Sequence, residues 1–190
     1  GLVLAGQGKT GEAVKNFRSV IPLDPNYFDA HFDLAVALHS QGQLAEATVH
    51  YRAAARVQPD EPRVRRRLAA ALIQQGQPNE AMTHFREAVR LEPEHAETQK
   101  DLGLALYKTG QTAEAVVYFR RALKLSPGKE PVMNNLAWIL VTSDDPEVRD
   151  PVEAVRLAEQ LSRGMANPSY YALDTMGAAY ASAGQYEKAV

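Results

Sequence analysis

The feature that most constrains the fold is a period of 34 residues, which four kinds of residue keep in phase. Prolines, glycines, alanines and aromatic residues each recur at this spacing. The four series are Pro25, Pro59, Pro93 and Pro127; Gly8, Gly42, Gly76 and Gly110; Ala13, Ala47, Ala81 and Ala115; and Phe17, Tyr51, Phe85 and Phe119. Such a period is the signature of stacked repeats, in which each unit buries its apolar side chains only against its neighbours.

Within each period the apolar residues follow two helical stripes with a glycine between them. Leu34 and Leu38 are spaced as one face of a first helix, and Ala47 and Tyr51 as one face of a second. The glycine suits the left-handed turn that closes the first helix, and the proline ends the second. We therefore predict pairs of helices. The rings predicted to fill the core between them are those of Tyr51, Phe85 and Phe119.

This pattern resembles the tetratricopeptide repeat, whose 34-residue unit has an Ala-x3-aromatic step and a late proline. The step is present from Ala47 to Tyr51, and Leu102-Gly103 followed by Leu106 matches the family's Leu-Gly-x2-Tyr element. The resemblance implies an all-α fold, a right-handed superhelical solenoid of antiparallel helix pairs that covers residues 1–190. In phase with the family, the units are 1–27 (partial), 28–61, 62–95, 96–129, 130–169 (divergent) and 170–190 (partial).

The unit that begins at Glu130 departs from the pattern. It is 40 residues long and has Ala158 where a ring is expected. Its extra residues lie at 142–150, between its two helices, and this stretch resembles a divergent unit found in bacterial proteins of the family. The four acidic residues in it do not have the spacing of a calcium-binding loop. We expect a solvated loop in which Asp150 caps the following helix.

Both ends of the sequence fall inside a unit, since the sequence begins at unit position 8 and stops at position 21. We therefore expect a fragment that is truncated at both ends. Incomplete end units leave apolar side chains without a neighbour, and Leu2, Leu4 and Met176 are examples. Self-association through the truncated ends is a prediction of this pattern.

The resemblance further implies that positions 2, 5, 6, 9, 12 and 13 of each first helix line the inner wall of the superhelix. Position 5 carries Arg66 and Lys100 in adjacent units without an acid at that position, while positions 9 and 12 are mostly apolar. An apolar strip with charged edges is typical of an interaction surface. The predicted peptide-binding groove consists of Phe32, Val36, His39, Arg66, Ile73, Lys100, Leu104, Tyr107, Asn134 and Trp138.

In this groove we expect Arg66 and Lys100, helped by Asn134, to hold a carboxylate or backbone carbonyl groups. Trp138, the only tryptophan, and its apolar neighbours would receive apolar side chains of the partner. The alternative for Trp138 is packing beneath the 142–150 loop or against the next unit.

Composition and motifs argue against several other functions. The net charge is −2, and two of the four arginines at 63 and 65–67, Arg63 and Arg67, alternate with acids in neighbouring units, so we predict no nucleic-acid partner. The longest apolar run, Leu136 to Val141, is too short to span a membrane, so no membrane partner is predicted for this segment. His50 and His84 share one repeat position, but two ligands make a poor metal site, so we expect outer-surface histidines.

No cysteine, phosphate-binding loop or catalytic motif is present, so we predict neither a cofactor nor an enzyme. The function predicted is a protein–protein interaction scaffold that binds a peptide segment or partner protein. The alternative is a regulatory or substrate-docking arm of a larger enzyme or membrane protein, such as a glycosyltransferase. Cytoplasm and periplasm are equally compatible with the sequence, and the partner's identity is not encoded in it.

Overall fold

The computed structural model describes residues 10–164, 170–185 and 188, and this part of the chain forms ten α-helices and no strand. Leu2, Leu4 and Gly8, on which the expected N-terminal apolar surface and first turn depend, lie outside the described residues. The chain divides into two compact units between Pro93 and Glu94, and each unit is described by itself.

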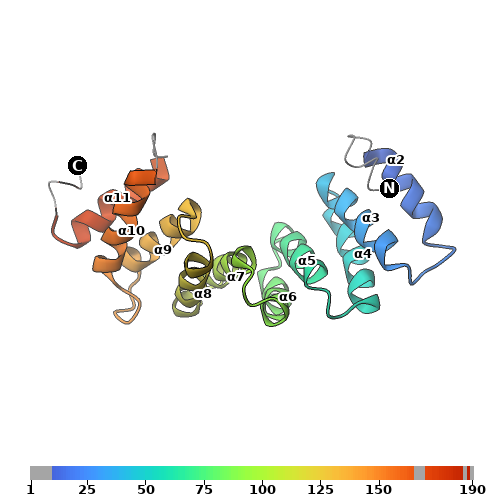
Figure 1. Ribbon diagram of the computed structural model, residues 1–190, viewed down its shortest axis with the longest axis horizontal. Helices are drawn as coiled ribbons and strands as arrows, with labels where there is room; N and C mark the ends of the chain where they lie inside the picture. Colours follow the sequence, from blue (N-terminus) through green and yellow to red (C-terminus); the bar gives the residue numbers. More distant parts are fainter. Residues whose placement is uncertain (1–9, 165–169, 186–187, 189–190) are drawn as a thin grey trace. The chain divides into compact units, whose positions relative to one another are not determined.

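The first unit is a series of helix pairs (Figure 1). Its helices are α2 (Thr10–Val20), α3 (Phe28–Ser40), α4 (Leu44–Val57), α5 (Pro62–Gln74) and α6 (Pro78–Leu91). Helix α3 packs against α4, and α5 packs against α6, while α2–α3 and α4–α5 contacts join consecutive pairs. The first helices of the two pairs begin at Phe28 and Pro62, the positions at which the family frame places the start of a repeat.

The second unit repeats this arrangement. Its helices are α7 (Ala96–Lys108), α8 (Thr112–Leu125), α9 (Glu130–Thr142), α10 (Pro151–Gly164) and α11 (Tyr170–Ser182). Helix α7 packs against α8, and α9 against α10, with further contacts between α8 and α9 and from α11 to both α9 and α10. The predicted all-α architecture of helix pairs is therefore confirmed.

The core of each regular pair forms around the ring that the second helix contributes. Tyr51, Phe85 and Phe119 are at most 2% exposed, as predicted. Removing a large ring from water is the main favourable contribution to packing one helix on the next. In α10 the ring is replaced by Ala158, which is also fully buried, and Leu161 lies one helical turn further on at 0% exposure.

Glycine closes the first helix of each regular pair, as the sequence indicates. Gly42, Gly76 and Gly110 have φ angles of 74°, 73° and 81°, a conformation that residues with a Cβ rarely adopt. The residue after each glycine donates its N–H to a carbonyl in the last turn of the helix, for example Gln43 to Leu38 at 2.9 Å. This is the Schellman arrangement, and it reverses the chain into the second helix.

The inserted loop between α9 and α10 is held by its own side chains. The carboxylate of Asp150 accepts a hydrogen bond from the N–H of Glu153 at 2.9 Å, which confirms the predicted helix cap. The carboxylate of Asp145 accepts one from the N–H of Glu147 at 3.0 Å, and Val148 is 5% exposed. Among the residues described, no group of three or more potential metal ligands occurs. No helix in the described ranges has the length and apolar character needed to cross a bilayer.

Candidate functional site

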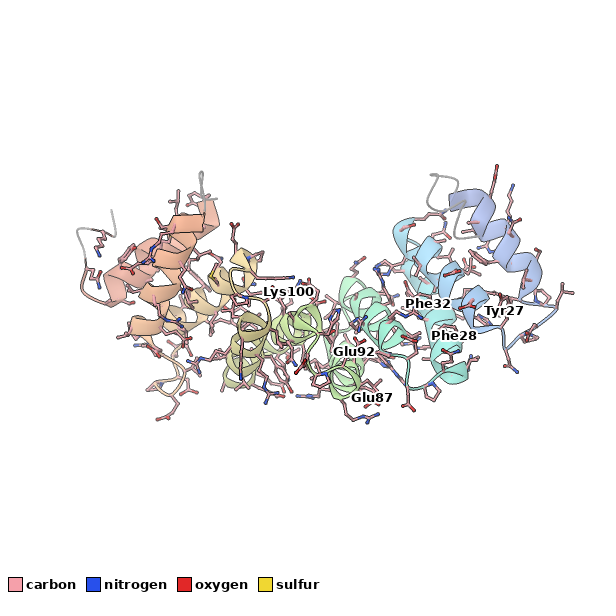
Figure 2. All side chains as sticks on the ribbon, viewed as in Figure 1. Tyr27, Phe28, Phe32, Glu87, Glu92 and Lys100 are labelled. Atoms are coloured by element: carbon pink, nitrogen blue, oxygen red, sulfur yellow. The ribbon has the colours of Figure 1, made fainter. Side chains whose placement is uncertain are left out.

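Five of the predicted groove residues lie in the first unit, and packing within that unit partly covers them. The ring of Phe32 stacks on the ring of Phe28, with centroids 5.9 Å apart. The guanidinium of Arg63 lies over the Phe32 ring, 5.5 Å from its centroid. Figure 2 labels both rings on α3. His39 meets the Tyr51 ring edge-on at 6.1 Å, and burial lowers the pKa of His39. Val36 and Ile73 are half-buried.

The two position-5 cations are not the unmatched pair that the sequence suggested. Arg66 forms an ion pair with Glu92, which follows α6, and only 21% of the Arg66 side chain is exposed. Lys100 pairs with Glu97 and also lies 3.1 Å from the carboxylate of Asp101. Burial opposes its charge, yet these two carboxylates hold the pKa of Lys100 above its ordinary value. Both cations therefore already have carboxylate partners within the chain.

The arginine-rich start of α5 is likewise engaged internally. Arg63 pairs with Glu61 at 2.9 Å, and Arg65 donates to the carbonyl of Pro59 at 2.9 Å and 3.1 Å. Glu61, and then Asp29 and Asp33 of the preceding repeat, raise the pKa of Arg63, so the acids that the alternating signs suggested also act on this arginine.

The histidines at the shared repeat position are not outer-surface residues, contrary to expectation. The side chains of His50 and His84 are each only 16% exposed. His50, on α4, faces His31 on α3, and their Nδ1 atoms are 3.0 Å apart. The Nε2 atom of His31 is in turn hydrogen-bonded to the carbonyl of Pro25. His84 has Arg65 at 3.4 Å in the corresponding place. Burial, followed by the neighbouring His31, lowers the pKa of His50.

In the second unit, α7 and α9 are the first helices of consecutive pairs, and both pack against α8. Near their N-terminal ends, Lys129 forms an ion pair with Glu97 at 2.8 Å. Near their C-terminal ends, Tyr107 and Thr142 line one cavity. The remaining five predicted residues lie on these helices, and we call their surface the α7–α9 face. It consists of Lys100, Leu104 and Tyr107 on α7 and Asn134 and Trp138 on α9; Figure 2 labels Lys100.

Two large aromatic side chains of the α7–α9 face remain in contact with solvent. Trp138 is 40% exposed and Tyr107 is 37% exposed. Neither the 142–150 loop nor a neighbouring helix covers Trp138 fully, which was the alternative expected for it. Asn134 lies one turn before Trp138, and its side-chain oxygen is buried without a hydrogen-bond partner. Leu104 is half-buried.

A cavity of about 580 Å³ opens beside the α7–α9 face. Its walls are Tyr107, the turn from α7 into α8, the end of α9 and the start of the inserted loop. Its lining includes the large side chains Tyr107 and Ile139 and the polar or acidic side chains Glu114, Thr142, Asp144 and Asp145. Sequence reasoning missed this site, because the loop has no helical period from which its position against α7 could be derived.

Two family profiles, both described as tetratricopeptide repeat, match residues 4–72 and 66–130. No curated protein matches the sequence. Solved structures that resemble the chain include MamA, with 17% identity, a TM-score of 0.77, and coverage of 85% of this chain and 91% of that one. Another is PilF of Pseudomonas aeruginosa, with 24% identity, a TM-score of 0.79, and coverage of 99% and 83%. A third is YrrB, described as a TPR protein with an unusual peptide-binding site, with 19% identity, a TM-score of 0.78, and coverage of 90% and 85%. At these identities the likeness establishes the fold alone.

Proposed function

Because the chain belongs to the tetratricopeptide repeat family, whose fold generally serves protein interaction, we propose that it is a scaffold that binds a peptide segment of a partner protein on the α7–α9 face. The observation that carries this proposal is the exposure of Trp138 on α9 and Tyr107 on α7, two helices that the Lys129–Glu97 ion pair and a shared cavity link. Large rigid rings lose little conformational entropy on docking and dominate binding hot spots.

The polar part of the same face supports a peptide backbone as the ligand. Asn134 precedes Trp138 by one helical turn, and its oxygen has no hydrogen-bond partner. A buried acceptor without a partner costs free energy, and a rotation of the amide toward a backbone N–H of the peptide removes that cost. Lys100 is paired with Glu97 and Asp101, so a carboxylate or carbonyl group of the partner would compete with these two side chains for its ammonium group.

The first unit supports the proposal less strongly. Its aromatic side chain at the corresponding surface, Phe32, is half-buried against Phe28 and lies close to Arg63. Arg66 is paired with Glu92. These side chains would have to give up contacts within the chain before they could contact a partner.

Selection from random peptides tests the proposal. A phage-displayed library of peptides of about 12 residues, about 40 Å when extended, is selected against the protein, and enriched peptides are synthesised. Trp138 is the only tryptophan, so its emission reports on binding at this face. We expect bound peptides to shift that emission. We also expect Trp138→Ala to weaken binding at least about tenfold, equivalent to about 1.4 kcal/mol.

Val117→Ala is the matched control, since Val117 is an apolar residue of α8 that is 44% exposed. Affinities of the variants are measured by fluorescence anisotropy of labelled peptides, with circular dichroism to verify that each variant is folded. A selection that enriches no peptide, or peptides that bind wild type and Trp138→Ala equally well, would refute the proposal.

A further inference from the structure

We propose that the cavity beside the α7–α9 face receives a lysine or arginine side chain of the bound peptide, so that the scaffold selects a basic partner segment. This inference rests on the proposed function and specifies the chemistry of its ligand. The cavity adjoins the α7–α9 face directly, because Tyr107 belongs to both. Thr142, which also lines the cavity, lies one helical turn beyond Trp138 and donates a hydrogen bond to its carbonyl at 2.7 Å.

The charges around the cavity favour a cation. Glu114, Asp144 and Asp145 line it, and no Lys, Arg or His is among the described residues that do so. The carbonyl end of α7 lies at the cavity and adds partial negative charge to this field. The end of α9 adds less, because the guanidinium of Arg149 bonds the carbonyl of the lining residue Ser143 at 2.8 Å and 3.0 Å. The positive N-terminal end of α8 is also there, but Glu114 in its first turn offsets that charge.

The shape and the apolar walls of the cavity fit a long basic side chain. Tyr107 exposes 37% of its surface, and a cation over an aromatic face is attracted by the ring's electrons. Ala113, which also lines the cavity and is exposed, provides an apolar surface for the methylene groups. A volume of about 580 Å³ exceeds what one such side chain needs, so the cavity also admits the peptide backbone on either side of it.

The spacing of residues along α9 also predicts the sequence order of the peptide side chains that bind. Along α9, Asn134, Trp138 and Thr142 follow one another at intervals of one turn, about 5.4 Å each. A peptide that places an apolar side chain against Trp138 therefore reaches the cavity within about two extended residues. Enriched peptides should share an aromatic or aliphatic residue with a lysine or arginine about two positions away.

The experiment compares matched peptides and matched carboxylates. In each enriched peptide the basic residue is replaced by glutamine, and binding is measured to wild type, to Asp144→Asn/Asp145→Asn and to Glu147→Gln. Glu147 is a loop carboxylate that does not line the cavity. Asparagine at 145 retains an oxygen that can accept the bond from the Glu147 N–H.

We expect the peptide substitution and the double variant each to weaken binding about tenfold, and together to weaken it no further than either alone. Glu147→Gln should leave affinity within about twofold. Peptides that need Trp138 but bind the double variant as tightly as wild type, or that share no basic residue, would overturn this inference while leaving the proposed function intact. Peptides indifferent to Trp138 would overturn both.

Discussion

Replacing Tyr51 by phenylalanine is expected to stabilise the protein. Tyr51 is fully buried, and its hydroxyl has no hydrogen-bond partner. The hydroxyl therefore lost its bonds to water on folding without replacement, a cost of about 1–3 kcal/mol. Phenylalanine keeps the ring and its edge-on contacts with Phe32 and His39, both with centroids 6.1 Å away. We expect the free energy of unfolding to rise by about 1–3 kcal/mol.

The pH dependence provides a second readout of the same hydroxyl. Burial raises the pKa of Tyr51 to about 12 from its ordinary value of 10.0. Because the folded state holds the tyrosine proton more tightly than the unfolded state does, the free energy of unfolding falls as the pH rises from about 10 to about 12. Tyr51→Phe should therefore remove part of the alkaline loss of stability, up to about 1.4 kcal/mol per pH unit.

Equilibrium urea unfolding, followed by far-ultraviolet circular dichroism at neutral and alkaline pH, measures both effects. Phe85→Tyr is the reciprocal control, because Phe85 has the same repeat position and is 2% exposed. It should lose stability by a similar amount. A Tyr51→Phe variant less stable than wild type by more than about 0.5 kcal/mol would refute the reasoning, since it would mean that the hydroxyl makes a favourable bond.

Three further changes test local features. Asp150→Ala removes the cap of α10 and should lower the unfolding free energy by about 1 kcal/mol, whereas Asp150→Asn should lower it less; urea midpoints decide between them. Gly76→Ala forces a Cβ into a φ of 73° and should cost about 1–2 kcal/mol, while Gly11→Ala, where no atom lies within 4 Å of the added Cβ, should show no loss in the same thermal denaturation. Burial lowers the pKa values of His50 and His84, so the unfolded chain takes up protons at a higher pH than the folded chain. The free energy of unfolding should therefore fall as the pH drops below 6.5, and in urea unfolding from pH 7 to pH 5 a His50→Gln variant should lose less stability than wild type.

Much of the fold could be predicted from the sequence because its determinants are local. Helices α3 and α5 begin at the predicted positions Phe28 and Pro62, since a proline and the apolar stripe mark each start. The positive φ of Gly42 was likewise predictable, because the chain reverses direction there and only glycine adopts that conformation at little cost. The burial of Phe119 follows from its place on the apolar stripe.

The candidate site was predictable only in part. Repeat positions identified Trp138 and Tyr107 as surface residues of adjacent units, and both are exposed. The same positions suggested that Lys100 would lack a carboxylate partner, yet Glu97, one turn earlier on the same helix, reaches it. A ladder of equivalent positions compares one residue per unit, so it overlooks partners at other positions of the same helix.

The sequence by itself determined the helix pairs, their turns and their buried rings, because a period of 34 residues and a helical stripe are properties of the chain that need no distant contact. Only the tertiary structure decided which side chains meet across helices. His31 and His50 are 19 residues apart, Arg66 and Glu92 are 26 apart, and both contacts depend on how one helix is rotated against the next. The cavity beside Tyr107 depends in the same way on where the aperiodic loop after α9 comes to rest, which packing decides and no sequence pattern encodes.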